Sequence, residues 1–390
     1  MTQLGREVFV VEATRTPVGR GHAEKGIYKD VHPADLLGRT YVELLRRAGI
    51  DSAEVDNVLA GCVMQIGEQS AGITRTAWLQ KGLAVTTGAT TIDVRCGSGQ
   101  QAVHLAALRV AAGVDDVVVA GGVEHMGRVG FPAHFGAQET YGQAFTDELY
   151  ALHPVTSQGK AAERIADDFG LSRGDLDAYA VQSHQRAAAA RDAGRFDREI
   201  FGVEAGGVVH RHDQGIRPDS TVERLAELGP VFGLTGGKIS AGNASQVSDG
   251  AAALLMTTRE KAAELGLTPR VRVVDQVVLG TDPATMLTGP IPATKKLLAR
   301  NGLTLADIDV VEINEAFASV VLAWAQALDA DMTKVNPRGG SIALGHPLGS
   351  TGARLITTAV HELEDDGGEF GIVTMCCGGG IGTATLLQRV

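Results

Sequence analysis

The feature of this sequence that most constrains its fold is an internal repeat. Residues 44–59 align without gaps on residues 297–312, an offset of 253. Each segment reads as the end of a helix, a glycine stop, a short acidic turn and the start of a strand. Two further pairs of strand-like segments keep nearly the same offset: 8–11 with 271–274, and 117–120 with 372–375. The sequence therefore predicts two copies of one α/β unit.

A cysteine follows one of the predicted strands. Residues 90–94 are β-branched and alternate like a strand, and apolar residues recur at helical spacing from Ala102 to Ala111, before Gly113. Cys96 is thus predicted at a strand-to-helix corner, where unpaired backbone N–H groups and the helix dipole stabilise a thiolate. We take Cys96 as the candidate nucleophile; the alternative is a buried structural thiol.

The repeat places a histidine opposite this cysteine. Position 96 maps near Gly349, at the end of a glycine-rich segment, 339–349, that contains His346 and precedes a predicted helix over 350–364. A pseudo-twofold axis between the copies would bring equivalent loops together. Cys96 and His346 are therefore predicted to meet although 250 residues of sequence separate them.

Composition limits the class of protein. With 390 residues, 44% of them hydrophobic, the chain can bury a large core and is expected to form two or three domains. A net charge of −11 argues against nucleic acid or an anionic membrane as the main partner. The four cysteines do not suggest a disulfide framework, and no signal-peptide or membrane-spanning pattern is visible, so the cytoplasm is expected. His210 and His212 lack neighbouring ligands at a recognisable spacing, and no metal site is expected.

Residues 123–245 do not show the α/β residue pattern of the two copies and are predicted to form an inserted loop domain. The insert begins with an aromatic-rich stretch from Phe131 to Tyr150, followed by a polar helix that Ser172 caps and Gly194 ends. We expect it to cover the site, with its aromatic residues equally suited to an oligomer contact. The predicted division is an N-terminal half, 1–268, interrupted by this insert, and a C-terminal half, 269–390.

Four motifs occur in this order along the chain, and jointly they resemble the thiolases. The motifs are Cys96-Gly97-Ser98-Gly99, Asn314-Glu315-Ala316-Phe317-Ala318, the glycine-rich run from Gly339 through Gly345-His346-Pro347 to Arg354, and Cys376-Cys377-Gly378-Gly379-Gly380-Ile381-Gly382. The resemblance extends over nearly the whole chain and is strongest to degradative actinobacterial 3-oxoacyl-CoA thiolases, a group that includes enzymes shortening steroid side chains.

This resemblance implies a fold and a reaction. The fold is the α/β thiolase fold, in which two βαβαβαββ halves stack in five layers, α/β/α/β/α, as homodimers or homotetramers. The reaction is thiolytic cleavage of a 3-oxoacyl-CoA by coenzyme A to acetyl-CoA and a shortened acyl-CoA. It proceeds in ping-pong fashion through an acyl-cysteine.

The resemblance also implies catalytic roles, residue by residue. Cys96 matches the cysteine that becomes acylated, and His346 matches the histidine that activates it. Cys376 matches the acid/base that protonates the departing acetyl-CoA carbon. Asn314 matches the asparagine whose bound water, with His346, stabilises the enolate oxygen. The backbone N–H groups of Cys96 and Gly378 would form a second oxyanion hole.

Coenzyme A is implied as a substrate, with no permanently bound cofactor. Arg217 matches the arginine at its adenine end, Ser245 the serine near the pantetheine, and Phe232 a phenylalanine beside it. Ser157 and Gln158 stand where acetoacetyl-CoA-specific biosynthetic members carry His-Met, which favours medium, long or bulky acyl chains.

Three other interpretations compete with a degradative thiolase. One is an acetoacetyl-CoA thiolase that runs the biosynthetic condensation. A second is a ketosynthase-like condensing enzyme, which shares the fold and a Cys–His pair but lacks the cysteine base in Cys-x-Gly-Gly-Gly. A third is a non-catalytic thiolase-like carrier, which predicts the loss of Cys96, His346 or Cys376; all three are present.

Overall fold

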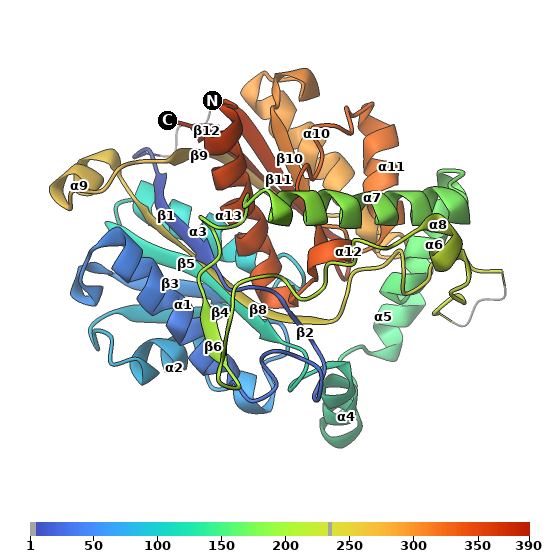
Figure 1. Cartoon of the computed structure of the whole chain (residues 1–390), viewed down its shortest axis with the longest axis horizontal. Helices are drawn as coiled ribbons and strands as arrows, with labels where there is room; N and C mark the ends of the chain where they lie inside the picture. Colours follow the sequence, from blue (N-terminus) through green and yellow to red (C-terminus); the bar gives the residue numbers. More distant parts are fainter. Residues whose placement is uncertain (1–4, 233–235) are drawn as a thin grey trace.

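The computed structural model describes residues 5–232 and 236–390. The strands of this part of the chain are β1 Phe9–Arg15, β2 Gly19–Arg20, β3 Asn57–Gly61, β4 Gly88–Ile92, β5 Val117–His125, β6 Val203–Ala205, β7 Val208–His210, β8 Ser248–Thr257, β9 Val271–Gly280, β10 Val310–Ile313, β11 Phe370–Cys377 and β12 Ile381–Arg389. Its helices are α1 Pro33–Ala48, α2 Ile73–Gln80, α3 Ser98–Ala111, α4 Phe131–Tyr141, α5 Asp147–Leu152, α6 Gln158–Asp168, α7 Arg173–Asp192, α8 Val222–Ala226, α9 Arg259–Glu264, α10 Pro290–Asn301, α11 Ala318–Leu328, α12 Ser341–Leu344 and α13 Leu348–Asp366 (Figure 1).

The strand order mirrors itself about one pair of strands. The first half runs β4-β3-β5-β8-β1, the second β10-β11-β12-β9, and β1 meets β9 through a short antiparallel contact that includes Val10 and Val271. The directions also correspond: β3–β5 and β10–β11 are parallel, whereas β5–β8 and β11–β12 are antiparallel. This symmetry confirms the two copies predicted from the sequence.

The aligned segments of the repeat take the same local structure. Helix α1 ends at Gly49 with φ 71° and ψ 27°, and α10 ends at Gly302 with φ 67° and ψ 26°. Both glycines adopt the left-handed conformation that commonly ends helices. A single 3-10 turn follows in each copy, Ser52–Glu54 and Leu305–Asp307, before β3 and β10 begin. The predicted glycine stops and acidic turns are therefore confirmed.

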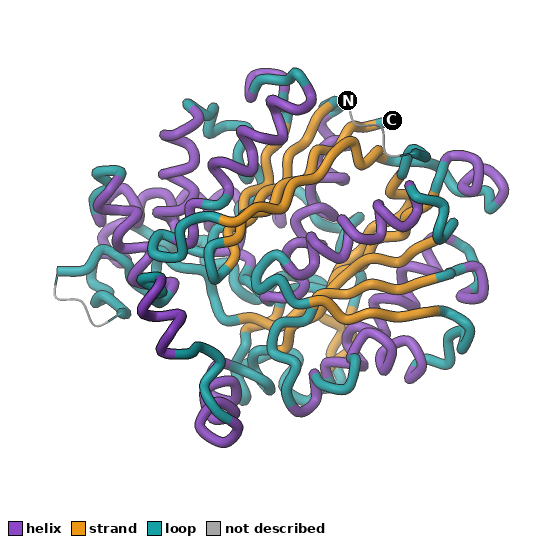
Figure 2. Tube along the Cα trace, turned by 180° about the vertical axis from the view of Figure 1, so that it is seen from behind, coloured by secondary structure: helices purple, strands orange, loops and turns teal. Residues whose placement is uncertain are grey.

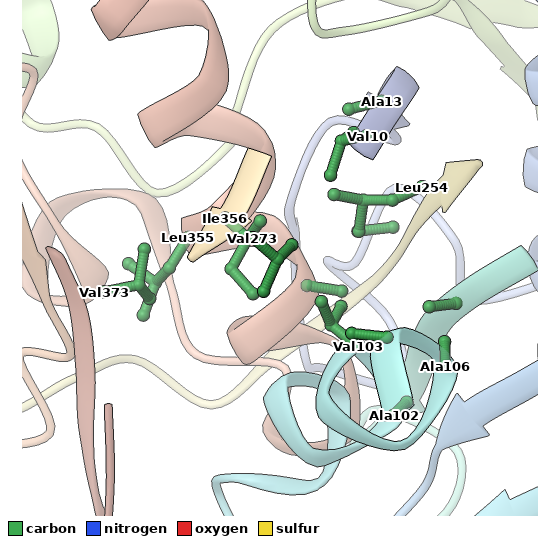
Figure 3. Close-up of a cluster of buried hydrophobic side chains, with 14 of the residues drawn as sticks. Val10, Ala13, Ala102, Val103, Ala106, Leu254, Val273, Leu355, Ile356 and Val373 are labelled. Atoms are coloured by element: carbon green, nitrogen blue, oxygen red, sulfur yellow. The ribbon is translucent and has the colours of Figure 1, made fainter. Parts of the chain in front are cut away.

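Helices α3 and α13 lie between the two halves of the sheet (Figure 2). One buried cluster contains apolar side chains of both helices and of the strands on either side of them. Two further clusters pack α1 and α2 on the outer face of the first half, and α10 and α11 on the outer face of the second. The layers are thus α/β/α/β/α. Figure 3 labels members of the central cluster: Val10, Ala13, Ala102, Val103, Ala106, Leu254, Val273, Leu355, Ile356 and Val373.

The first turns of α3 and α13 touch through glycines. A Cβ atom at Gly99 would lie 2.7 Å from the carbonyl oxygen of Gly349 and 2.9 Å from the amide nitrogen of Ala353. A Cβ atom at Gly349 would lie 2.5 Å from the carbonyl oxygen of Val123 and 2.7 Å from that of Gly61. Because these neighbours are backbone atoms, no side chain at either position could be accommodated by rotation alone. The contact brings the two strand-to-helix corners together.

The insert lies between β5 and β8 and has two parts. Helix α7 begins with the predicted capping box of Ser172 and Asp175 and packs with α6 against the second half of the molecule. Helices α4 and α5 contain no buried residue and project from the body (Figure 1). Their aromatic side chains are exposed in the single chain, Tyr141 to 88%. None of the described helices is both long and apolar enough to cross a bilayer.

We expect Gly349→Ala to destabilise the protein, because the added methyl group meets backbone atoms of two segments, Gly61 and Cys62 at the end of β3 and Val123 in β5. Overpacking of this kind typically costs about 1–3 kcal/mol. Gly136→Ala is a matched control, since Gly136 lies in α4 with no atom within 4 Å of an added Cβ. The measurement is the urea midpoint at one protein concentration. Equal midpoints for both variants would contradict a tight contact between the first turn of α13 and the strands β3 and β5.

Candidate active site

Cys96 is presented by a tight turn between β4 and α3. Arg95, the residue before it, has φ 53°, which is uncommon for a non-glycine residue. Ser98 stabilises the turn: its hydroxyl group accepts a hydrogen bond from the amide of Val94 at 2.9 Å and donates one to the carbonyl of Arg95 at 2.5 Å. The chain therefore reverses around Cys96, as predicted, and α3 starts two residues later.

The Cys96 thiol lies where three segments of the chain meet. It is only 3% exposed, and this burial raises its pKa to about 11. The backbone N–H of Gly378 and the side-chain amide of Gln158 act in the opposite direction, because their hydrogen bonds favour the thiolate. A Cβ atom at Gly378 would lie 2.9 Å from Nε2 of Gln158, so this amide sits against the loop after β11. At neutral pH the resting sulfur is a thiol, and its ionisation needs a base.

Two more cysteines end β11 beneath this turn. Cys376 and Cys377 are both buried, and as neighbours on a strand they face opposite sides of the sheet. A Cβ atom at Gly97 would lie 2.7 Å from Sγ of Cys377, which places this sulfur against the backbone next to Cys96. Burial raises the pKa of both thiols, and the nearby sulfur of Cys96 raises it further.

The loop before α13 positions His346. The preceding Gly345 has φ 114°, and the backbone amide of His346 donates to the Gln246 carbonyl and to Oγ of Ser248, at 3.2 Å each. The first turn of α13 is the one that meets the first turn of α3. The structure therefore brings the Cys96 and His346 motifs together, as the repeat predicts.

Hydrogen bonds fix the protonation of the His346 ring. Nδ1 lies 2.6 Å from Oγ1 of Thr351, and this hydroxyl group donates to the carbonyl of Pro347 at 2.8 Å. Since the hydroxyl hydrogen is used, Thr351 accepts from Nδ1–H, and Nε2 keeps its lone pair. Burial, with the nearby charge of Arg354, lowers the pKa of His346 to about 3, so the ring is neutral at physiological pH.

Asn314 faces the free nitrogen of this ring. Its Nδ2 lies 3.3 Å from Nε2 of His346, and its Oδ1 accepts a hydrogen bond from the hydroxyl group of Ser341 at 2.7 Å. All three side chains are buried. The amide hydrogens of Asn314 therefore point to the side of the ring where a base would act.

The residues predicted to contact coenzyme A lie around these motifs. Phe232 packs edge-on against Phe317, with ring centroids 5.9 Å apart. The backbone amide of Ser245 donates to the carbonyl of Ala316 at 3.0 Å. Farther out, the exposed Arg217 reaches Oε1 of Gln246 at 3.3 Å. Phe232 and Ser245 thus border the Asn314 motif, and Arg217 borders the backbone partner of His346.

Two buried carboxylates hold the site loops, and no role was predicted for either. Glu124 accepts hydrogen bonds from the backbone amides of Val63 and Gly349, both at 2.9 Å, and so ties the end of β5 to the first turn of α13. Glu315 accepts from four donors on α7, α12 and the preceding loop: Tyr179, Ser183, Asn336 and the amide of Ile342. Only the motif position of Glu315 hinted at importance. No cluster suited to a metal ion occurs among the described residues.

Comparisons with known proteins agree with this geometry. Residues 8–260 match the family model of the thiolase N-terminal domain, and residues 267–389 match that of the thiolase C-terminal domain. The steroid 3-ketoacyl-CoA thiolase FadA6 of Mycobacterium tuberculosis is 44% identical over 391 residues, covering 98% of this chain and 94% of that protein. The 3-ketoacyl-CoA thiolase of Saccharophagus degradans is 41% identical over 399 residues and covers all of both chains.

Solved structures of thiolases are also similar to this chain. Human mitochondrial 3-ketoacyl-CoA thiolase, solved in complex with CoA, superposes with a TM-score of 0.89 at 36% identity and covers 99% of both chains. The acetyl-CoA acetyltransferase of Bacillus anthracis also superposes with a TM-score of 0.89 at 36% identity over the full length of both chains. The predicted thiolase fold is confirmed, and the chain belongs to the thiolase family.

Proposed function

We propose that this chain catalyses the thiolytic cleavage of a 3-oxoacyl-CoA by coenzyme A, giving acetyl-CoA and an acyl-CoA shortened by two carbons. The observation that carries the proposal is the contact between the first turns of α3 and α13 at Gly99 and Gly349, because the buried thiol of Cys96 and the neutral imidazole of His346 lie in the loops just before these turns. Relatives named 3-ketoacyl-CoA thiolase, matched over nearly the whole chain, support the same reaction.

The first half-reaction forms the acyl-enzyme. Nε2 of His346 takes the proton of Cys96, and the thiolate attacks the 3-oxo carbon of the substrate. The bond between C2 and C3 then breaks, and the acyl group stays on Cys96. The electron pair of the broken bond goes to C2, which leaves as the enolate of acetyl-CoA. A water molecule held by Asn314, with the imidazolium of His346, stabilises the enolate oxygen. Such donors are effective because they are fixed in a dry site before the reaction.

Cys376 completes both half-reactions. Its thiol protonates C2 of the enolate, which releases acetyl-CoA and leaves a thiolate. This thiolate takes the proton of the incoming coenzyme A, whose sulfur attacks the acyl-Cys96 carbonyl. The N–H groups of Cys96 and Gly378 hold the oxyanion, and Cys96 leaves and recovers its proton from His346. The strongly raised pKa of Cys376 suits a group that must stay protonated until a carbanion forms.

Coenzyme A is the second substrate, and no permanently bound cofactor is needed. The insert would hold it, with Arg217 near the adenine end and Ser245 and Phe232 along the pantetheine. A positive residue at the rim is required because the chain as a whole carries a net charge of −11.

We further propose a degradative role with acyl chains longer than acetoacetyl. The support is Gln158, which lies against Gly378, where the acyl group would sit, and the similarity to a thiolase named for steroids. The alternative role is biosynthetic condensation, because an acetyl-CoA acetyltransferase superposes with the same TM-score. Because α4 and α5 bury no side chain, their aromatic residues suit an oligomer contact better than a pocket wall. A homo-oligomer and a cytoplasmic location stay predictions.

Trapping the intermediate tests the function. Incubated with a 3-oxoacyl-CoA but no free coenzyme A, the protein should gain the mass of the shortened acyl group on the peptide that contains Cys96, and Cys96→Ala should gain none. A panel of C4, C8 and sterol side-chain substrates should show higher kcat/KM for the longer chains. An adduct on another cysteine at full activity would sink the proposed mechanism.

Variants of the two adjacent cysteines test the acid/base assignment. Cys376→Ala should lower kcat by about 10²–10⁴-fold, the usual contribution of a positioned acid or base, whereas Cys377→Ala should stay within about tenfold. Both variants remove one buried sulfur from the same strand, so each controls for the other. The opposite ranking in steady-state thiolysis would assign the proton transfer to Cys377.

The tautomer of His346 gives a further prediction. Thr351→Val removes the acceptor for Nδ1–H and should slow alkylation of Cys96 by iodoacetamide about tenfold, the worth of one hydrogen bond of about 1.4 kcal/mol. Thr351→Ser should keep most of the rate. Thr357→Val is the control, because Thr357 is equally buried on α13 but bonds only to the carbonyl of Ala353. Equal rates for Thr351→Val and wild type would refute the tautomer assignment.

A further inference from the structure

A buried arginine lies behind the catalytic loop. Arg354, on α13, is 1% exposed, and its guanidinium group pairs with the carboxylate of Glu312 at 3.6 Å. The same guanidinium group donates a hydrogen bond from Nη2 to Oγ of Ser341 at 3.0 Å. The mechanism above gives no role to Arg354 or to Ser341.

The direction of each hydrogen bond in this region follows from its donors. A guanidinium group only donates, so Oγ of Ser341 must accept from Arg354 and has one hydrogen left to give. That hydrogen goes to Oδ1 of Asn314 at 2.7 Å, which leaves Nδ2 of Asn314 facing Nε2 of His346 at 3.3 Å. A one-way chain of donors therefore runs from Arg354 through Ser341 to Asn314, whose amide hydrogens face the side of His346 that carries Nε2.

We propose that Ser341 and Arg354 are positioning residues that hold the side-chain amide of Asn314 in the orientation needed at His346. The proposal deepens the proposed function and rests on it for the identity of the reaction. Ser341, Asn314 and Arg354 are at most 1% exposed, so solvent cannot replace a missing donor without entering the core. Arg354 contributes orientation through Ser341, and its positive charge adds to the burial that lowers the pKa of His346.

Loss of the Ser341 hydroxyl group should free the Asn314 amide to flip. The flipped amide would present Oδ1 to His346 and favour the tautomer that carries its hydrogen on Nε2, because a carbonyl oxygen needs a donor. Such a ring cannot take the proton of Cys96. The flip would also remove the N–H donor that holds the water at the enolate oxygen.

The test compares three serine variants of the full chain. Ser341→Ala should lower kcat for thiolysis about tenfold with little change in the KM for coenzyme A, and should slow alkylation of Cys96 by iodoacetamide by a similar factor. Ser341→Thr keeps a hydroxyl group and should recover much of both rates. Ser350→Ala is the control, because Ser350 is also buried near the loop but bonds only to the carbonyl of Pro347, at 3.2 Å.

Several outcomes would overturn the proposal. They are wild-type rates in Ser341→Ala, an equal loss in Ser350→Ala, no recovery in Ser341→Thr, or a loss of thiolysis with unchanged alkylation. Urea midpoints of the variants check that the fold is intact. Alkylation does not require a 3-oxoacyl substrate. A wild-type protein without thiolysis would therefore refute the proposed function, while the alkylation series would still decide the role of Ser341.

Discussion

The contact between the first turns of α3 and α13 is the constraint on which the rest of the structure depends. The two helices approach so closely at Gly99 and Gly349 that backbone meets backbone. Each helix follows a loop that carries a reactive side chain, Cys96 in one half and His346 in the other. The symmetry of the two halves therefore has a chemical purpose, because it places two N-terminal helix ends, and the groups just before them, at one point.

Burial at this point governs the charge state of the site. It raises the pKa of Cys96 to about 11 and lowers that of His346 to about 3, so the resting pair is a neutral thiol and a neutral imidazole. Such a pair does not form an ion pair in advance. Negative charge develops only during the reaction, on a substrate oxygen atom that the surrounding N–H groups can stabilise. The site therefore stabilises the transition state more than the resting state.

Buried hydrogen bonds give the site its precision. The ring of His346 is held by Thr351 on one nitrogen and faces Asn314 on the other. Behind them, Glu124 and Glu315 accept several hydrogen bonds each and join loops from different parts of the chain. A carboxylate that satisfies several backbone and side-chain donors fixes their relative positions, because leaving any of them unpaired in the core is costly.

The sequence by itself determined the repeat, the glycine stops after α1 and α10, the corner at Cys96 and the capped start of α7. These depend on glycine stops, capping residues and periodicity, which act among near neighbours in the chain. The family motifs further marked Cys96, Asn314, His346 and Cys376. Only the tertiary structure decided the tautomer of His346, the amide of Gln158 beside Cys96 and the link from Arg354 through Ser341 to Asn314. The partners in these contacts come from separate elements, and packing, not local propensity, sets their distances and hydrogen-bond directions.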